Sequence, residues 1–134
     1  MTADTAVLAA NAAFYEAFAD RDIAAMDALW ARRSTVACIH PGWPPLIGRE
    51  RVMESWRAIL SNPEAPRIRC TEPVVHMLQD AAIVVCLEIV DDGFLAATNL
   101  FVREGERWLM AHHQAGATAY TPSGDAPDMS GTVH

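Results

Sequence analysis

The sequence predicts an α+β fold, in which a curved, mostly antiparallel sheet carries helices on one face. Apolar residues recur at helical spacing in three stretches within the first 61 residues, and the period changes to strand-like alternation from Arg67 to Ala117. Three helices followed by four longer strands are typical of an α+β sandwich. The 134 residues suffice for one domain, which we expect over residues 1–120. Residues 121–134, rich in Pro, Gly, Ser and Asp, are expected to form an extended C-terminal tail.

The first two helices are predicted from their apolar stripes. Val7, Phe14 and Phe18 fall at helical spacing within residues 4–20, and Asp22 suits the N-cap of a second helix over residues 23–30. The two helices are expected to pack as a hairpin. Asn11 lies within the first apolar stripe. It is either a buried polar group that a neighbour's backbone satisfies, which we favour, or a hydrogen-bond donor in a pocket.

A short strand over residues 35–39 is expected to lead into a stiff loop that contains His40, Trp43 and three prolines. Because proline fixes φ and removes a backbone donor, this loop is predicted to be neither an ordinary strand nor a helix. His40 and Trp43 either line a ligand cavity or belong to a corner that covers an edge of the core. A third, amphipathic helix follows over residues 49–61 and ends at Asn62-Pro63.

The remaining chain predicts an antiparallel meander, because strand-like stretches alternate with short turn signals. The expected strands are residues 67–78, interrupted by Pro73, then 82–90, 94–103 and 107–117, with turns at Gln79-Asp80, Asp91-Asp92-Gly93 and Glu104-Gly105.

The last hairpin decides which side chains share a face of the sheet. If Glu104-Gly105 is a two-residue turn, Asn99 pairs with Met110, and Asn99 and His112 lie on one face. We favour this register, because a residue followed by Gly suits the centre of a primed turn. A three-residue turn would shift the pairing by one residue and place His113 on that face instead.

Charge and composition exclude several classes of partner. The formal net charge is -7, and all ten cationic residues are arginine. Nucleic acid and anionic membranes are bound by clustered Lys and Arg, so neither is expected as a partner. The N-terminus has no positively charged region, and no apolar stretch approaches the roughly 18 residues of a membrane span, so we expect a cytoplasmic protein. The three cysteines are far apart and are expected to be buried and reduced.

Two polar residues stand out within the predicted strands. Asn99 is either a hydrogen-bond donor in a pocket, which we favour, or a satisfied core amide, since asparagine is depleted in strands. Glu88 either faces solvent or an edge, which we favour, or pairs with an imidazole. His40, His112 and Glu88 could supply three metal ligands, but their spacing is not that of a metal motif. We therefore expect no metal. The sequence has no Gly-rich phosphate loop and no Gly-x-Ser-x-Gly nucleophile motif of a Ser/His/Asp triad, and we expect no cofactor.

Four sequence blocks carry a family resemblance: residues 14–22, 26–30, 97–103 and 107–113. Their order and spacing resemble the snoaL-like branch of the nuclear transport factor 2-like superfamily, which also contains ketosteroid isomerase, and the resemblance extends over residues 5–118. It implies a cone-shaped α+β barrel with a pocket between the concave sheet and three helices. It also implies a homodimer through the convex sheet face. Enzymes of this superfamily, including polyketide cyclases, move protons on apolar carbonyl compounds.

Carried over by position, the resemblance to the isomerase is partial. The isomerase's catalytic base corresponds to Cys38, and His40 follows two residues later on the same side of the strand. Its first-helix tyrosine corresponds to Phe14, next to Tyr15. Its oxyanion-holding acid corresponds to Asn99, whose amide can donate a hydrogen bond. Because neither the base nor the tyrosine is present at its corresponding position, steroid isomerisation is not expected.

Two functions follow as hypotheses. The first is a cofactor-free proton-transfer enzyme, an isomerase, cyclase or dehydratase that acts on a small apolar carbonyl compound. The second is a non-catalytic binding or dimerisation module of the same fold, because a fold alone does not decide function. In the enzyme, His40 would be the general base, and Asn99 with His112 would hold the oxyanion. The expected ligand-binding residues are Asn11, Phe14, Tyr15, Phe18, Met26, Trp30, Trp43, Trp56, Phe101 and His113.

Overall fold

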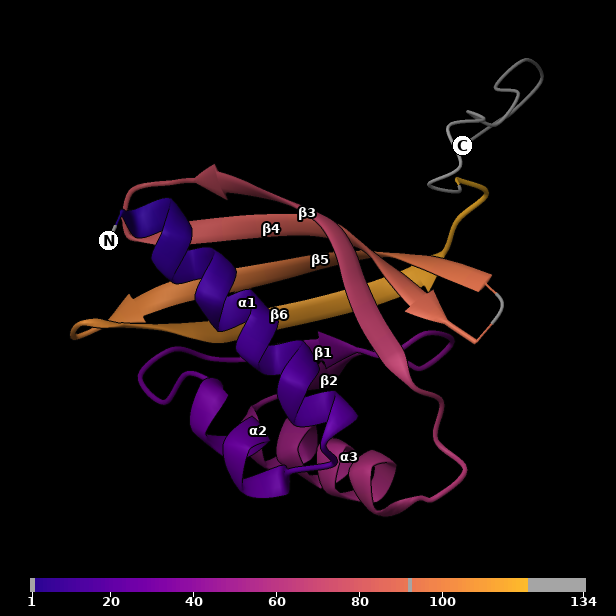
Figure 1. Ribbon diagram of the computed structural model, residues 1–134. Coiled ribbons are helices and arrows are strands. Elements are labelled where there is room, and N and C mark those ends of the chain that lie inside the picture. Colours follow the sequence, from indigo (N-terminus) through magenta and orange to yellow (C-terminus); the bar gives the residue numbers. More distant parts are fainter. Residues whose placement is uncertain (1, 92, 121–134) are drawn as a thin grey trace.

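A six-stranded mixed sheet and three helices form the molecule, and the predicted α+β class is confirmed (Figure 1). The computed structural model describes residues 2–91 and 93–120. Asp92 of the predicted turn and the predicted tail, residues 121–134, lie outside the described residues. The elements are α1 (Ala3–Ala19), α2 (Ile23–Leu29), β1 (Ala37–Ile39), β2 (Leu46–Ile47), α3 (Arg49–Ser61), β3 (Ile68–Met77), β4 (Ala81–Val90), β5 (Gly93–Glu104) and β6 (Arg107–Ala117).

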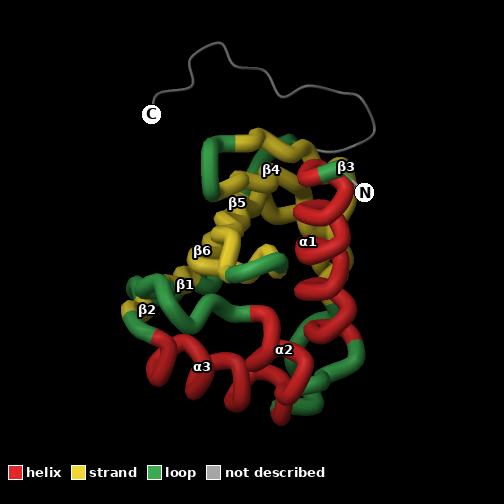
Figure 2. The backbone as a smooth tube through the Cα atoms, turned by 90° about the vertical axis from the view of Figure 1, so that its left-hand side faces the viewer, coloured by secondary structure: helices red, strands yellow, loops and turns green. Residues whose placement is uncertain are grey.

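The strand order is β2-β1-β6-β5-β4-β3, so the predicted meander β3 to β6 makes up most of the sheet. The meander is antiparallel, whereas β1 pairs parallel with β6. In the described chain the sheet stays open, with β2 and β3 at its edges. Helix α1 runs along the face of the sheet, and α2 and α3 lie beside its β1–β2 end (Figure 2). This arrangement matches a cone-like sheet (Figure 2).

No helix in the described part is long and apolar enough to cross a membrane.

The proline loop contains a short strand that the sequence analysis did not predict. Leu46 and Ile47 pair antiparallel with Cys38 and Ala37. Both residues follow Pro45 and retain their backbone N–H groups, so they can form the ladder that the prolines cannot.

The predicted register of the last hairpin is wrong. Glu104 pairs with Arg107, so Gly105, with a φ of +66°, is the first residue of the turn and not its second. The register shifts again between Phe101 and Leu100, at a β-bulge in β6. As a result Asn99 lies opposite His113.

The start of α3 is held by two adjacent residues. Gly48 has φ +94° and ψ 149°, and its N–H donates to the carbonyl oxygen of Val36 at 2.8 Å. The Arg49 guanidinium donates to the carbonyl oxygens of Asp27 at 2.6 Å and Trp30 at 2.9 Å. These contacts tie α3 to α2 and orient its buried face toward the sheet.

Candidate functional site

A cavity of about 460 Å³ lies between α1, α3, the proline loop and the inner face of the sheet. Six residues that the sequence analysis proposed for the site line it: Phe14, Phe18, His40, Trp43, Trp56 and His113. The remaining lining residues are Pro41, Ile59, Asn62, Glu64, Ala65, Pro66, Ile68, Glu88, Val90 and Leu95.

Glu88, on β4, is the charged group at the centre of the site. It shares the inner face of the strand with Cys86, Val84 and Ala82, and it is only 2% exposed. The expectation that Glu88 faces solvent is therefore wrong. Burial raises the pKa of its carboxyl to about 7, and the hydrogen bond that Tyr15 donates at 2.6 Å opposes the rise. Apolar residues occupy both faces of β4, so no alternation in the sequence could have placed Glu88 inside.

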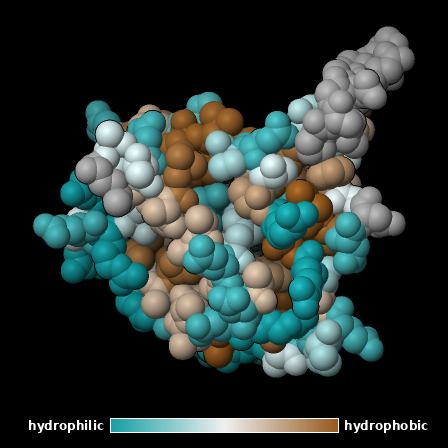
Figure 3. Space-filling model, in the orientation of Figure 1, coloured by the Kyte–Doolittle hydropathy of each residue, from teal (hydrophilic) through white to brown (hydrophobic). Residues whose placement is uncertain are grey.

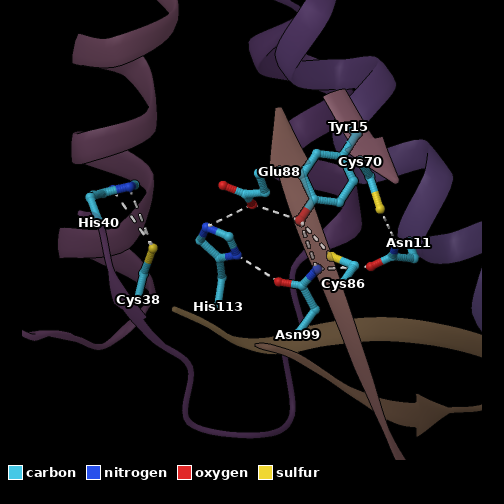
Figure 4. A network of polar contacts seen from close by, with 9 residues as sticks. All are labelled: Asn11, Tyr15, Cys38, His40, Cys70, Cys86, Glu88, Asn99 and His113. Carbon is cyan, nitrogen blue, oxygen red and sulfur yellow. Dashed lines mark hydrogen bonds and ion pairs between the residues drawn. The ribbon is translucent and has the colours of Figure 1, made fainter. Parts of the chain in front are cut away.

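A hydrogen-bonded chain connects Glu88 to His113 through two other side chains (Figure 4). The Asn99 amide nitrogen donates to Asn11 Oδ1 at 2.8 Å and to the Tyr15 hydroxyl at 3.1 Å. Its oxygen lies 2.6 Å from His113 Nδ1, and His113 Nε2 lies 3.9 Å from Glu88 Oε2. Burial, and to a smaller extent the nearby His40 and His112, lower the pKa of His113 to about 3. The site therefore holds a neutral imidazole beside a carboxyl that titrates near neutrality.

His40 lies on another wall of the cavity, in the proline loop. Its ring centroid is 4.8 Å from the rings of both Trp43 and Trp56. Its Nε2 is 2.9 Å from the hydroxyl of Ser55, a buried α3 residue that sequence reasoning missed because its spacing matches no motif. Burial lowers the pKa of His40 from the ordinary imidazole value of 6.5 to about 4, so the imidazole is neutral at physiological pH. Burial likewise raises the pKa of the adjacent Cys38 thiol to about 12.

The structure brings some predicted site residues together and separates others. Asn11, Tyr15, Asn99 and His113 meet in the hydrogen-bonded chain, where the Asn99 amide nitrogen is already engaged. His112 pairs with Leu100 on the other face of the sheet, so the prediction that it shares a face with Asn99 is wrong. Three further predicted ligand-binding residues are buried in the core and do not line the cavity: Met26, Trp30 and Phe101.

Among the described residues, the cavity wall carries acidic side chains without basic ones of the Lys or Arg type to balance them. Its lining residues include the carboxyls of Glu64 and Glu88 and no arginine. Within residues 2–91 and 93–120, no group of three or more His, Cys, Asp and Glu side chains is arranged to hold a metal ion. The arrangement can bind a small apolar molecule against aromatic rings and exchange a proton with it near neutral pH.

Comparisons with known proteins agree with this fold. A crystal structure from Streptomyces avermitilis, described as a candidate dehydratase of the nuclear transport factor 2-like family, is 31% identical, with a TM-score of 0.81, 87% of this chain covered and 96% of that one. A Thiobacillus denitrificans structure, described as a candidate calcium/calmodulin-dependent protein kinase type II association domain, is 34% identical, with a TM-score of 0.74 and coverage of 83% and 94%.

A curated relative, the F-box protein SKIP8 of Arabidopsis thaliana, is 29% identical over 112 residues. The match covers 82% of this chain, which spans about half the length of that relative, 48%. The family model described as a SnoaL-like domain matches residues 7–120. That match extends from the first turns of α1 past the end of β6 and so includes every element that forms the cavity. The chain therefore belongs to the SnoaL-like domain family of the nuclear transport factor 2-like superfamily.

Proposed function

We propose that this protein is a proton-transfer enzyme of the isomerase, cyclase or dehydratase type that acts on a small apolar carbonyl compound. The observation that carries the proposal is Glu88, a buried carboxyl on the cavity wall whose pKa is raised to about 7. A group that titrates near the working pH can both give and take a proton at useful rates. Perturbed ionisable groups in cavities are typical of catalytic sites. The candidate dehydratase from S. avermitilis supports the same reaction class.

Each polar side chain has a distinct part in this proposal. Glu88 exchanges the proton with the substrate, and Tyr15 fixes its carboxyl by donating to Oε2 at 2.6 Å. His40 is a neutral base on another wall, and its low pKa makes it a weaker base than expected from the sequence. Asn99 is a positioning residue that orients His113 and Tyr15, because its amide nitrogen is occupied and is not free to hold an oxyanion. The aromatic walls formed by Trp56, Phe14 and Phe18 would hold the apolar part of the substrate.

The substitution Glu88→Gln tests the proposal. Gln keeps the shape and can still accept from Tyr15, but it cannot transfer a proton. We expect kcat to fall by about 10²–10⁴-fold on any carbonyl compound that the wild-type protein converts. Glu64→Gln is the matched control, because Glu64 also lines the cavity but is exposed, and its kcat should stay within a few-fold of wild type. Circular dichroism would establish that both variants are folded. Wild-type kcat in Glu88→Gln would contradict the assignment.

A second candidate function is self-association, and the outer face of the sheet favours it. Val74 on β3 and Val85 on β4 lie directly opposite each other and are 54% and 43% exposed. Val85 alternates with the inward-facing Val84 and Cys86, so both valines point away from α1. An exposed pair of apolar side chains on an uncovered sheet face is typical of an interaction surface. The 34% identity to a candidate association domain supports this proposal, and we infer a homodimer through this face.

A further inference from the structure

The hydrogen-bonding direction of His113 follows from its neighbours. Because the Asn99 amide nitrogen donates to Asn11 and Tyr15, the Asn99 oxygen is the atom that faces His113 Nδ1, at 2.6 Å. An amide oxygen only accepts, so Nδ1 carries the hydrogen. In the neutral ring Nε2 is then a bare acceptor, and it is turned toward Glu88 (Figure 4).

The direction at His40 is decided in the same way. The Ser55 hydroxyl donates its single hydrogen to the carbonyl oxygen of Val52 at 2.6 Å. It therefore accepts from His40 Nε2, 2.9 Å away. In the neutral imidazole this leaves His40 Nδ1 as an acceptor, and the only donor that the described residues place near it is the weak Cys38 thiol, 3.8 Å away.

Glu88 contributes the third acceptor. Tyr15 donates to Oε2, and the other carboxyl oxygen is turned away from both Tyr15 and His113 (Figure 4). When ionised, this carboxyl only accepts, and when protonated it offers one donor. Glu64 also lines the cavity and no arginine of the described chain does, so the cavity disfavours a negatively charged ligand.

Resting on the proton-transfer function proposed above, we propose that the substrate is an uncharged compound with a hydroxyl group near its carbonyl group. A hydroxyl supplies a donor for His113 Nε2 or the second Glu88 oxygen, and a stronger donor for His40 Nδ1 than the Cys38 thiol. A carboxylate or phosphate would instead bring a further negative charge. The corresponding reaction is dehydration of a β-hydroxy ketone. His40 takes the proton from the carbon beside the carbonyl, the carbon–oxygen bond breaks, and protonated Glu88 gives its proton to the departing hydroxyl. The products are an enone and water, and solvent returns the proton from His40 to Glu88.

Binding of three probes that cannot undergo the proposed dehydration tests the ligand class. 4-Phenyl-2-butanol, 4-phenyl-2-butanone and 3-phenylpropanoate share an apolar end and differ at the polar one. Binding would be measured by the quenching of tryptophan fluorescence, since Trp43 and Trp56 line the cavity. We expect the alcohol to bind about tenfold more tightly than the ketone, and the carboxylate to bind more weakly than either. The preference for the alcohol should grow from pH 6 to pH 8, because ionised Glu88 only accepts. His76→Ala, an exposed residue of the outer face, should leave all three affinities unchanged.

Equal or tighter binding of the ketone or the carboxylate, or no binding of the alcohol, would overturn this ligand class. Turnover separates it from the proposed function. Conversion of 4-hydroxy-4-phenyl-2-butanone to its enone, followed by ultraviolet absorbance, supports both. If the protein prefers the alcohol but catalyses neither that turnover nor any other proton transfer, the ligand class is supported and the enzymatic function is contradicted. Exchange of the α-hydrogens of 4-phenyl-2-butanone in D2O without an alcohol preference would keep the function and overturn the ligand class.

Discussion

Burial moves the pKa values of the acid and of the bases in this cavity in opposite senses. The pKa of Glu88 rises from 4.5 to about 7, and that of His40 falls from 6.5 to about 4. Both shifts favour the neutral form, because charge is costly away from water. For Glu88 this cost outweighs the Tyr15 hydrogen bond, which favours the ionised carboxylate.

Glu88 should make stability depend on pH. Its pKa is higher in the folded state than in the unfolded state, so its contribution is full below pH 4.5 and is lost as pH rises through about 7. The loss is on the order of 3 kcal/mol. His40 and His113 act in the opposite sense below pH 6.5, since their pKa values are lowered. The histidine contributions are common to Glu88→Gln and wild type, so they cancel when the unfolding free energy of wild type is subtracted from that of the variant. This difference should change in favour of the variant between pH 4.5 and pH 8, because only wild type loses the Glu88 contribution. Urea titrations would measure it, and a difference that is independent of pH would contradict the raised pKa.

The three thiols should differ in reactivity. A hydrogen bond with Cys86 lowers the pKa of Cys70, whose side chain lines a surface groove between α1 and β3. Cys38 and Cys86 are buried with raised pKa values. We expect iodoacetamide to modify Cys70 at least tenfold faster than the other two in the folded protein, because thiolate fraction and access control alkylation. Peptide mass spectrometry would identify the modified site, and Cys70→Ser should abolish the fast phase. First modification at Cys38 would contradict the expectation.

At the scale of elements, the glycine before α3 sets where the helix begins, and α3 carries Trp56 on the cavity wall and Ser55 beside His40. Gly48 adopts φ +94° and ψ 149°, a conformation that side chains with a Cβ rarely adopt. The space around its Cα is open, so a substitution meets conformational strain and no clash.

Gly48→Ala should therefore lower the unfolding free energy by about 1–3 kcal/mol. Gly116→Ala is the matched control, since a Cβ there also meets nothing within 4 Å and its φ is not positive. We expect the control to stay within about 0.5 kcal/mol of wild type. Thermal melting of the two variants would measure the difference. Equal melting temperatures would show that a side chain at position 48 causes no backbone strain.

At the scale of the whole molecule, the inner face of the sheet is covered by helices and the outer face exposes apolar side chains. Apolar surface also gathers over β3 and β4 beside α1, where Leu8, Met77 and Leu78 are exposed (Figure 3). The two apolar regions lie on different sides of the sheet, so single substitutions can separate their roles.

Val85→Lys should convert the inferred homodimer to a monomer. A buried lysine without a partner is costly at an apolar interface, so we expect at least a hundredfold weaker self-association. Leu8→Lys is the control on the helical side and should remain dimeric. Sedimentation velocity would measure both masses. A monomeric wild-type protein, or a Val85→Lys variant that stays dimeric, would contradict dimerisation through the outer face.

The order and type of the elements could be predicted because they depend on local chemistry. Helical spacing, proline and turn residues are properties of short segments, and they predicted α1, α2, α3 and the meander. The family resemblance then predicted how these elements are arranged in space, and the match to the SnoaL-like domain model supports that resemblance. The parallel pairing of β1 with β6 joins residues 37–39 to residues 112–114, and no local pattern encodes it.

The site depended on two nonlocal features that local patterns do not encode. The bulge in β6 exchanges the faces of His112 and His113, and a single extra residue has no signature in a run of strand-forming side chains. The environment of Glu88 depends on Tyr15, 73 residues away, and on the helices that exclude water from the inner face. The sequence by itself determined the elements and which aromatic residues were available. Only the tertiary structure decided which carboxyl is buried, because burial and its effect on pKa arise from contacts between distant segments.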